Sequence, residues 1–442
     1  MKKTIFFVVL LLVIGCSLTS CGKDEGVYFL NFKPEIAEEY EQIAKVYEKE
    51  TGVPIRVVTA ASGSYEQTLK SEIVKKNAPV IFQINGPVGY SAWKDYCLDL
   101  SGSMLYSHLS DKSLAIRDGN GVYGIPYVVE GYGIIYNEEI TDKYFALADR
   151  ATAYNSMEEV TSFAALKAVV EDMTAKKAAL GIDGVFASTS LKSGEDWRWQ
   201  THLANVPVYY EFLDSNVDLT DPSTYAEVSF RYGEQYRNLF DLYLKNSTTE
   251  PGLLGSKQVA DSMAEFALGK CAMVQNGNWA YGQISEVSGN TVKAENVKFL
   301  PLYTGVSEEE SQGICVGTEN YFAINKNAPA DKQQQALDFL NWLFTSETGK
   351  TFVTEKLGFI APFDTFDESD RLEDPLAAQV SEWLAREDVY NIPWQFTVFP
   401  GSDFKNDFGA ALLQYAQGTK TWDEVKQIFV TRWKEESAAI HK

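Results

Sequence analysis

The fold is decided near the start of the chain by Val27-Tyr28-Phe29-Leu30-Asn31-Phe32, a β-branched and aromatic run that predicts a strand. Pro34 then opens a segment whose apolar residues recur at helical spacing through Tyr47. Two further strands are predicted at residues 53–58 and 79–84, with a helix at residues 65–76 between them. This order predicts a parallel sheet covered by helices, with a ligand bound at the carboxyl ends of its strands.

The rest of the chain continues this alternation of strands and helices. Two extended segments meet around Glu130, and the strand that begins at Cys271 ends in a glycine turn that carries Trp279. Further helices are predicted at residues 161–180, 197–212, 225–245, 261–269, 331–345 and 421–436, and a further strand at 317–326. No internal repeat or low-complexity linker separates these segments. The pattern therefore predicts an α/β protein whose lobes share several crossings of the chain.

The N-terminus is typical of a secretion signal. Lys2 and Lys3 precede an apolar run at residues 5–14, which is shorter than the ~20 residues that a membrane-spanning helix needs. Leu18-Thr19-Ser20-Cys21-Gly22 resembles the bacterial lipobox, in which the signal is cut before a lipidated cysteine. Cys16 also fits that pattern, but cutting there would shorten the apolar region. We therefore expect a signal peptide at residues 1–20, lipidation at Cys21 and a tether at residues 21–26.

Composition narrows the function classes. The 442 residues include 39 Lys and Arg against 61 Asp and Glu, a net charge of −22, which makes nucleic acid an improbable partner. Beyond the signal, Cys97, Cys271 and Cys315 allow at most one disulfide, and Cys271 lies in an apolar run typical of the core. No zinc-like spacing exists, and Asp214-Ser215-Asn216-Val217-Asp218 lacks the glycine and distal glutamate of an EF-hand. We expect no metal and no cofactor.

The order of motifs resembles the family of extracellular solute-binding proteins that deliver carbohydrates to ABC importers, which includes maltose-binding protein. Four stretches carry the resemblance, and they span nearly the whole exported chain: residues 47–53, residues 123–137, residues 269–279 and Asn391-Ile392-Pro393 with the helical tail that follows. The resemblance implies two α/β lobes joined by a multi-strand hinge, with the ligand enclosed between them. Ligand would favour the closed form because it contacts both lobes.

The resemblance also implies site residues. A pyranose has apolar faces and a rim of hydroxyls, so aromatic planes and polar side chains should converge on it. Trp279 corresponds to the family's stacking tryptophan, and Glu130 to a hydroxyl-binding glutamate. Trp197 and Phe399 lie near two further aromatic positions, with Trp199 and Trp394 as their alternatives. The remaining candidates are the loop residues Lys33, Glu35 and Asn85.

The loops at residues 31–35 and 83–87 do not reproduce those of maltose-binding protein, so the resemblance does not identify the sugar. Two other functions stay open. A peptide or polyamine could replace the sugar, since a polyamine site needs carboxylates converging with aromatics and the net charge permits that. A glycosidase would need a carboxyl pair about 5–10 Å apart across the cleft. Of the three histidines, only His202 lies near the expected cleft, and a helix-face hydrogen bond is its expected role.

Together these features predict a monomeric, lipid-anchored receptor on the extracellular face of the cytoplasmic membrane. It would bind a sugar or oligosaccharide, present it to the permease subunits of an ABC importer and catalyse no reaction. The only membrane contact would be the lipid anchor. The first lobe is expected at residues 27–127 and 313–360, and the second at residues 131–305 and 364–442.

Overall fold

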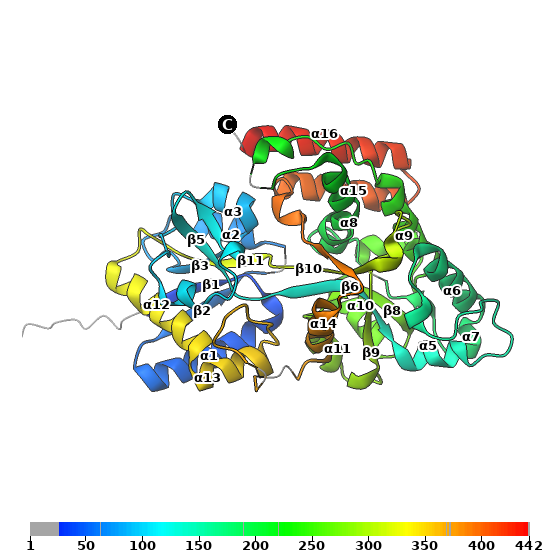
Figure 1. Ribbon diagram of the computed structural model, residues 1–442, viewed down its shortest axis with the longest axis horizontal. Coiled ribbons are helices and arrows are strands. Elements are labelled where there is room, and N and C mark those ends of the chain that lie inside the picture. Colours follow the sequence, from blue (N-terminus) through cyan, green and yellow to red (C-terminus); the bar gives the residue numbers. More distant parts are fainter. Residues whose placement is uncertain are drawn as a thin grey trace, which may run out of the picture.

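The computed structural model of the chain describes residues 26–61, 63–188, 190–219, 221–367, 369–370 and 373–440. The expected signal peptide and the cysteines of both lipidation motifs, Cys16 and Cys21, lie outside the described residues. The chain forms two lobes, each built around a six-stranded sheet, and Figure 1 shows them side by side with β6 and β10 between them. This is the two-lobed α/β fold that the sequence predicts.

The first sheet has the strand order β2-β1-β3-β11-β5-β4. β1 pairs in parallel with both β2 and β3, which confirms the predicted parallel arrangement, whereas β11 is antiparallel to β3 and β5. Its strands are β1 (Val27–Asn31), β2 (Ile55–Thr59), β3 (Ile81–Asn85), β4 (Ile116–Asp118), β5 (Gly121–Pro126) and β11 (Asn320–Ile324).

Helices cover both faces of the first sheet. Side chains alternate along a strand, so Val27 and Phe29 join the core that includes Tyr40 of α1, while Tyr28 and Leu30 join the core beside α2. The burial of all five β1 residues explains why this strand reads as a continuous apolar run. The helices of this lobe are α1 (Ala37–Thr51), α2 (Tyr65–Glu72), α3 (Gly86–Trp93), α4 (Met104–His108), α12 (Ala330–Thr345) and α13 (Glu347–Thr351).

The second sheet has the strand order β12-β10-β6-β8-β7. β6 is its central strand: β8 pairs along one edge, while β10 and β9 pair with successive parts of the other. All eight β6 residues are buried as a result. The strands are β6 (Glu130–Asn137), β7 (Gly184–Phe186), β8 (Cys271–Gly277), β9 (Val297–Leu300), β10 (Gln312–Gly317) and β12 (Tyr390–Pro393).

The second lobe is rich in helices, and α15 and α16 pack together at the top of Figure 1. The helix predicted at residues 225–245 begins only at Gly233, and the one predicted from residue 197 begins as a π-helical segment, η4 (Arg198–Leu203). The helices are α5 (Glu138–Phe145), α6 (Phe163–Ala175), α7 (Lys177–Leu180), α8 (Ala204–Ser215), α9 (Gly233–Asn246), α10 (Val259–Ala267), α11 (Ala280–Ser285), α14 (Pro375–Ala385), α15 (Ser402–Ala416) and α16 (Trp422–Ile440).

The chain crosses between the two sheets after β5, after β10 and between α13 and α14. Hydrogen bonds join these crossings: the Thr318 hydroxyl donates to the Val128 carbonyl at 3.0 Å, and Val129 N donates to the Ile360 carbonyl at 2.8 Å. Gly313, where the return to the first lobe was expected to begin, lies in β10 of the second sheet, so this crossing falls at residues 318–319.

Cys97, Cys271 and Cys315 are free, buried thiols. Cys271 begins β8 and is fully buried, which confirms its predicted place in the core. Burial also raises the pKa of each thiol, so these side chains behave as small apolar residues at neutral pH.

A substitution at Gly131 in β6 tests how tightly this central strand is packed. A Cβ there would lie 2.3 Å from Cγ2 of Val380 and 2.9 Å from Cδ1 of Ile314. We expect Gly131→Ala to lower the free energy of unfolding by about 1–3 kcal/mol through overpacking. In the control, Gly282→Ala in α11, the added Cβ meets nothing within 4 Å, and we expect unchanged or slightly higher stability. Urea unfolding monitored by circular dichroism compares them, and equal midpoints would contradict the packing described.

Candidate functional site

Trp279 follows β8 in a short turn that leads into α11. Gly277 permits this turn, because a Cβ there would lie 2.2 Å from Cζ3 of the Trp279 ring. Two hydrogen bonds fasten the turn to β6: Gly131 N donates to the Asn278 side-chain oxygen at 2.9 Å, and Asn278 N donates to the Gly131 carbonyl at 3.1 Å. The ring is therefore held against the first residues of the central strand.

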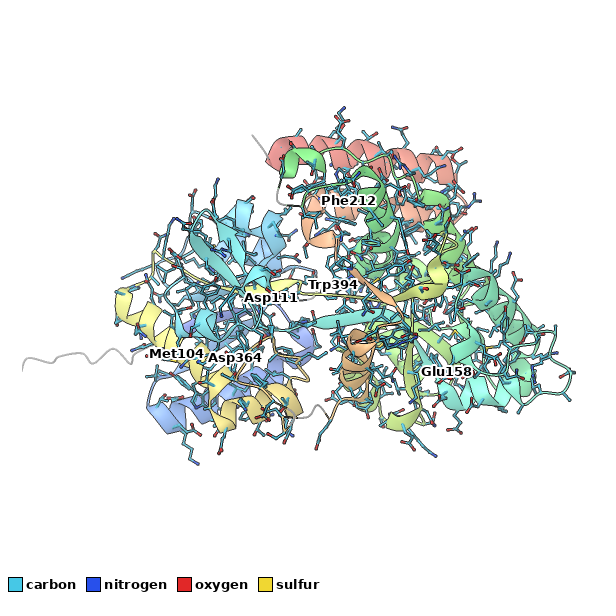
Figure 2. All side chains as sticks on the ribbon, viewed as in Figure 1. Met104, Asp111, Glu158, Phe212, Asp364 and Trp394 are labelled. Carbon is cyan, nitrogen blue, oxygen red and sulfur yellow. The ribbon has the colours of Figure 1, made fainter. Side chains whose placement is uncertain are left out.

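Trp279 belongs to an aromatic cluster of the second lobe. Its ring centroid lies 5.9 Å from that of Trp197 and 6.0 Å from that of Tyr132. His202 packs against Tyr132 at 4.4 Å and Trp197 at 4.8 Å, and Trp394 lies 5.7 Å beyond His202. Trp197 and Trp279 are partly exposed, whereas the other three rings are buried. Figure 2 places Trp394 near the middle of the molecule, beside the strands that link the lobes. Trp197 and Trp279 are thus the members of the cluster that reach the surface, and each also lies beside a cation, Arg198 and Lys33 respectively.

A buried ion pair connects the first lobe to this cluster. Lys33 follows β1, and its Nζ donates to Oε1 of Glu130, the first residue of β6, at 2.5 Å. The two side chains are only 5% and 2% exposed, and Nζ also lies 5.5 Å from the centre of the Trp279 ring. Asn31 fixes the loop, because its side chain donates to the Lys33 carbonyl and accepts from Lys33 N. The pair therefore spans from the first sheet to the second.

Two more carboxylates approach Lys33. Oε1 of Glu35 lies 3.6 Å from Nζ, and Glu319, in the crossing between β10 and β11, interacts with Lys33 electrostatically. Asn85, at the end of β3, donates to Oε1 of Glu319 at 2.7 Å. The structure thus brings together Lys33, Glu35, Asn85, Glu130 and Glu319, and four of these five are residues that the resemblance singled out.

Burial and charge determine the protonation of this group. Burial raises the pKa of Glu130 to about 7, against the opposing effect of Lys33. Burial would lower the pKa of Lys33, but the carboxylates of Glu130, Glu35 and Glu319 outweigh it and raise that pKa. Burial likewise raises the pKa of Glu319. Lys33 is consequently protonated at neutral pH and serves as the positive centre of the group.

Several buried polar atoms around the aromatic cluster have no hydrogen-bond partner among the described residues. They are Oε2 of Glu130, all three guanidinium nitrogens of Arg198, Nε2 of His202, Oε1 of Gln275 and Nε1 of Trp394. Buried polar groups in folded proteins are nearly always paired, because leaving one unpaired costs about 1–3 kcal/mol. Their concentration beside two partly exposed tryptophans makes this region the candidate site for a polar ligand.

The structure separates the aromatic candidates. Trp197 and Trp394 lie in the cluster, whereas Trp199 is 1% exposed, donates to the Ser190 carbonyl at 3.0 Å and packs in the core. Phe399 is not brought to the cluster: it is 1% exposed and packs 4.9 Å from Trp433. The short helix η10 (Phe396–Val398) turns the chain after β12, so Phe399 points beneath α16. Trp394, the alternative to Phe399, lies in the aromatic cluster instead.

Sequence reasoning missed Arg198, Gln275, Glu319 and Tyr132 and gave His202 only a structural role. Arg198 lies between two tryptophans in the sequence, where a basic residue flanked by aromatics was a usable signal. Gln275 and Tyr132 sit on buried strands, and nothing in their local sequence distinguishes them from core residues. Glu319 becomes part of the site only because β11 runs antiparallel beside β3, a pairing between distant segments.

The described residues hold no group of three or more His, Cys, Asp or Glu side chains that could bind a metal ion. The carboxylate of Asp214, in the turn weighed as a calcium loop, accepts a hydrogen bond from the Tyr232 hydroxyl at 2.8 Å and pairs with Arg231 at 3.1 Å. These contacts fit a surface turn.

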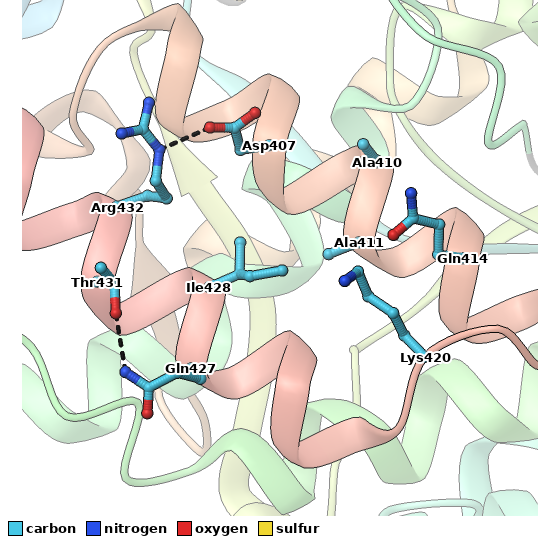
Figure 3. A pocket seen from close by; sticks show the side chains of 9 residues that line it. All are labelled: Asp407, Ala410, Ala411, Gln414, Lys420, Gln427, Ile428, Thr431 and Arg432. Atoms are coloured by element: carbon cyan, nitrogen blue, oxygen red, sulfur yellow. Dashed lines mark hydrogen bonds and ion pairs between the residues drawn. The ribbon is translucent and has the colours of Figure 1, made fainter.

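A separate pocket lies between α15 and α16 (Figure 3). Ile428 and two alanines form its apolar lining, and an Arg432–Asp407 ion pair lies at one end. Its lining includes no aromatic side chain, so it offers no plane on which a sugar ring could stack.

Residues 42–379 match the family model described as bacterial extracellular solute-binding protein. The chain belongs to this family. No curated protein is significantly similar to it in sequence. Members of this family are solute-binding proteins, so the polar and aromatic cluster is a candidate solute site.

Solved solute-binding structures share the fold over nearly their whole length. A chitin oligosaccharide binding protein superposes with a TM-score of 0.71 at 15% identity, covering 93% of this chain and 98% of the other. A Bacillus licheniformis sugar transporter protein in complex with stachyose gives 0.66 at 16%, covering 93% and 100%. The GacH receptor of Streptomyces glaucescens, solved unliganded and with acarbose, also gives 0.66 at 16%, covering 93% and 98%. At these identities the likeness establishes the fold.

The raised pKa of Glu130 predicts a pH-dependent contribution to stability. The folded pKa is about 7 against an ordinary value of 4.5, so the folded state binds the proton more tightly than the unfolded chain does. This contribution is present below about pH 4.5 and is lost as the pH rises through about 7. We expect the stability of the wild type relative to Glu130→Gln to fall across this window.

Urea unfolding of both proteins at several pH values within the window measures this difference. The exposed Glu41→Gln variant serves as the control and should leave the pH dependence unchanged. A wild-type advantage over Glu130→Gln that rises with pH would show that Lys33 lowers the pKa of Glu130 below its ordinary value, contrary to this account.

Proposed function

We propose that this solute-binding protein is a lipid-anchored receptor that captures a sugar or oligosaccharide and delivers it to the permease of an ABC importer. The observation that carries the proposal is the pair of partly exposed tryptophans, Trp197 and Trp279, beside a cluster of buried, unpaired polar atoms. Aromatic planes suit the apolar faces of a pyranose, and the polar atoms suit its hydroxyls. The subunit itself makes and breaks no bond.

The related structures support a saccharide as the solute. By their descriptions, those proteins bind a chitin oligosaccharide, stachyose and acarbose, which are all carbohydrates or carbohydrate analogues. This chain shares their fold and carries an aromatic cluster on the second lobe, with the Trp279 ring 5.5 Å from Nζ of Lys33 in the first lobe. A saccharide is therefore the solute class that best combines the fold with the local chemistry.

A polyamine is the alternative that the carboxylates Glu35, Glu130 and Glu319 favour, since they converge next to aromatic rings. Lys33 already pairs with two of them from within the group, at 2.5 Å from Glu130 and 3.6 Å from Glu35. A cationic ligand would have to displace Lys33 from a buried ion pair. This cost supports an uncharged or anionic solute over a polyamine.

The proposed anchor rests on the lipobox that ends at Cys21, which lies outside the described residues. No helix in the described part of the chain is long and apolar enough to cross a membrane. Lipid at Cys21 would tether the lobes to the extracellular face of the cytoplasmic membrane through residues 21–26. There the receptor would act as a monomer whose closed form docks on the permease.

Ligand capture would proceed by closure of the lobes, which are in contact in this structure. Gly86, the first residue of α3, adopts a positive φ of +59° and faces Thr397 of the second lobe. A Cβ on Gly86 would lie 2.7 Å from the Thr397 Cβ and 2.8 Å from its carbonyl oxygen. The absence of a side chain at this position lets the two backbones approach.

Trp279→Ala tests the stacking plane. We expect the affinity for a saccharide identified in a thermal-shift screen to fall at least about tenfold, because the ring is one of the two partly exposed aromatic rings of the cluster. Trp383→Ala, in α14 and outside the cluster, is the matched control and should bind as the wild type does. Calorimetry measures both, and equal affinities for wild type and Trp279→Ala would contradict the proposed site.

Gly86→Ala tests closure. The positive φ alone costs about 1–2 kcal/mol of stability, so the control is Gly52→Ala, at φ +78° with open space around the new Cβ. Both variants should unfold somewhat more easily than the wild type. Only Gly86→Ala should also weaken saccharide binding, by about tenfold, because its Cβ meets Thr397 in the closed form. An unchanged affinity would mean that the bound form does not bring these residues together.

A further inference from the structure

Arg198 is a fully buried cation beside the stacking planes. It is 0% exposed, its guanidinium carbon lies 4.2 Å from the centre of the Trp197 ring, and none of its three side-chain nitrogens has a hydrogen-bond partner among the described residues. Burial lowers the pKa of Arg198 to about 10, which still leaves the side chain charged at neutral pH. The site therefore contains a permanent positive charge with unused donors.

Arg198 lacks the carboxylate partners that Lys33 has. Lys33 has Glu130 at 2.5 Å and Glu35 at 3.6 Å, whereas Arg198 forms no ion pair with any described residue. Glu195 acts on it electrostatically, but Oε2 of Glu195 accepts from Val259 N at 3.2 Å. A cation–π contact with Trp197 contributes about 0.5–2 kcal/mol, less than the several kcal/mol that burying an unpaired ion costs.

The other unpaired atoms near Arg198 are mainly acceptors. Oε1 of Gln275 is one, and its Nε2 donates to the Tyr132 hydroxyl at 2.9 Å and to the Arg198 carbonyl at 3.1 Å. His202 provides another. Nδ1 of His202 lies 2.9 Å from the Thr201 hydroxyl, which donates to the Trp197 carbonyl, so Nδ1 carries the proton.

Burial, together with the positive charges of Arg198 and Lys33, lowers the pKa of His202 well below its ordinary value. The imidazole is thus neutral, and its unpaired Nε2 accepts a hydrogen bond. The cluster accordingly offers a planar cationic fork together with neutral acceptors. A ligand that satisfies both carries an anionic group and hydroxyl donors on one framework.

We infer that the solute is an acidic saccharide, such as a uronic acid or an oligosaccharide that bears one, whose carboxylate binds Arg198. The guanidinium fork matches a carboxylate through two parallel hydrogen bonds, while sugar hydroxyls donate to Gln275 and His202. The carbon face of the sugar stacks on Trp197 and Trp279. The Lys33 ammonium, in contrast, is already paired with Glu130 and Glu35. This inference rests on the proposed function and narrows its solute class.

Pairs of a sugar acid and its methyl ester test the inference with the wild-type protein. Calorimetry would compare glucuronate, galacturonate and trigalacturonate with their methyl esters, and with glucose, galactose and raffinose as neutral saccharides. Esterification keeps the shape of the sugar and removes the charge. We expect at least one acid to bind, and its methyl ester to bind at least tenfold more weakly, because hydrogen bonds between ions are about twice as strong as neutral ones.

Variants at Arg198 then test whether this residue causes the preference for the acid over its methyl ester. Arg198→Gln should abolish the preference for the acid over its ester, whereas Arg198→Lys keeps the charge, loses the fork and should retain part of it. Arg56→Gln is the matched control, since Arg56 stacks on Tyr28 at 3.8 Å in the first lobe. It should leave the preference unchanged. The wild-type comparison of acid with ester decides the question if a variant at the buried position fails to fold.

The outcomes test the inference of an acidic saccharide, the proposed function as a sugar receptor, or both. Binding of an acid with a marked loss on esterification supports the inference. A neutral saccharide that binds as tightly as its acidic counterpart overturns the acidic class and leaves the sugar receptor standing. Failure of every saccharide in the panel to bind, in a protein that melts cooperatively, overturns the inference together with the proposed function.

Discussion

The site depends on the pairing between the start of β6 and the turn after β8. The reciprocal hydrogen bonds between Gly131 and Asn278 hold that turn, and with it the Trp279 ring, against the central strand of the second sheet. The same strand begins with Glu130, which receives Lys33 from the first lobe. One strand thus positions the stacking plane and the contact between lobes, so a shift of β6 would displace both at once.

The charges of the site are divided between the two lobes. Lys33 of the first lobe lies in a buried group with its carboxylate partners, where the short contact with Glu130 of the second lobe offsets part of the cost of burying ions. On the second-lobe side the Arg198 guanidinium lies over the Trp197 ring and has no hydrogen-bond partner among the described residues. A solute held between the tryptophans and Arg198 would complete the hydrogen bonds of that half, and it would favour closure of the lobes only through further contacts with the first lobe.

Local sequence patterns predicted much of this architecture, because its elements are decided by local periodicity. The alternation through residues 27–84 indicated the parallel strands, and the glycine turn after β8 indicated Trp279. The start of α9 was missed, because residues 225–232 look helical but pack as an irregular segment that contains Phe230 at a positive φ. Arg198 was missed although its place between two tryptophans was a usable local signal, whereas Glu319 escaped prediction because its role arises from the pairing of distant segments. Phe399 was misplaced because a short helix after β12 turns it into the core.

A crystal structure of the protein with the tightest-binding saccharide would test the central claim most directly. This account predicts that the sugar lies between the lobes, with a ring stacked on Trp279 or Trp197 and a polar group within hydrogen-bond distance of Arg198. Sugar found instead in the groove between α15 and α16, or on an outer face with the aromatic cluster unchanged, would contradict it.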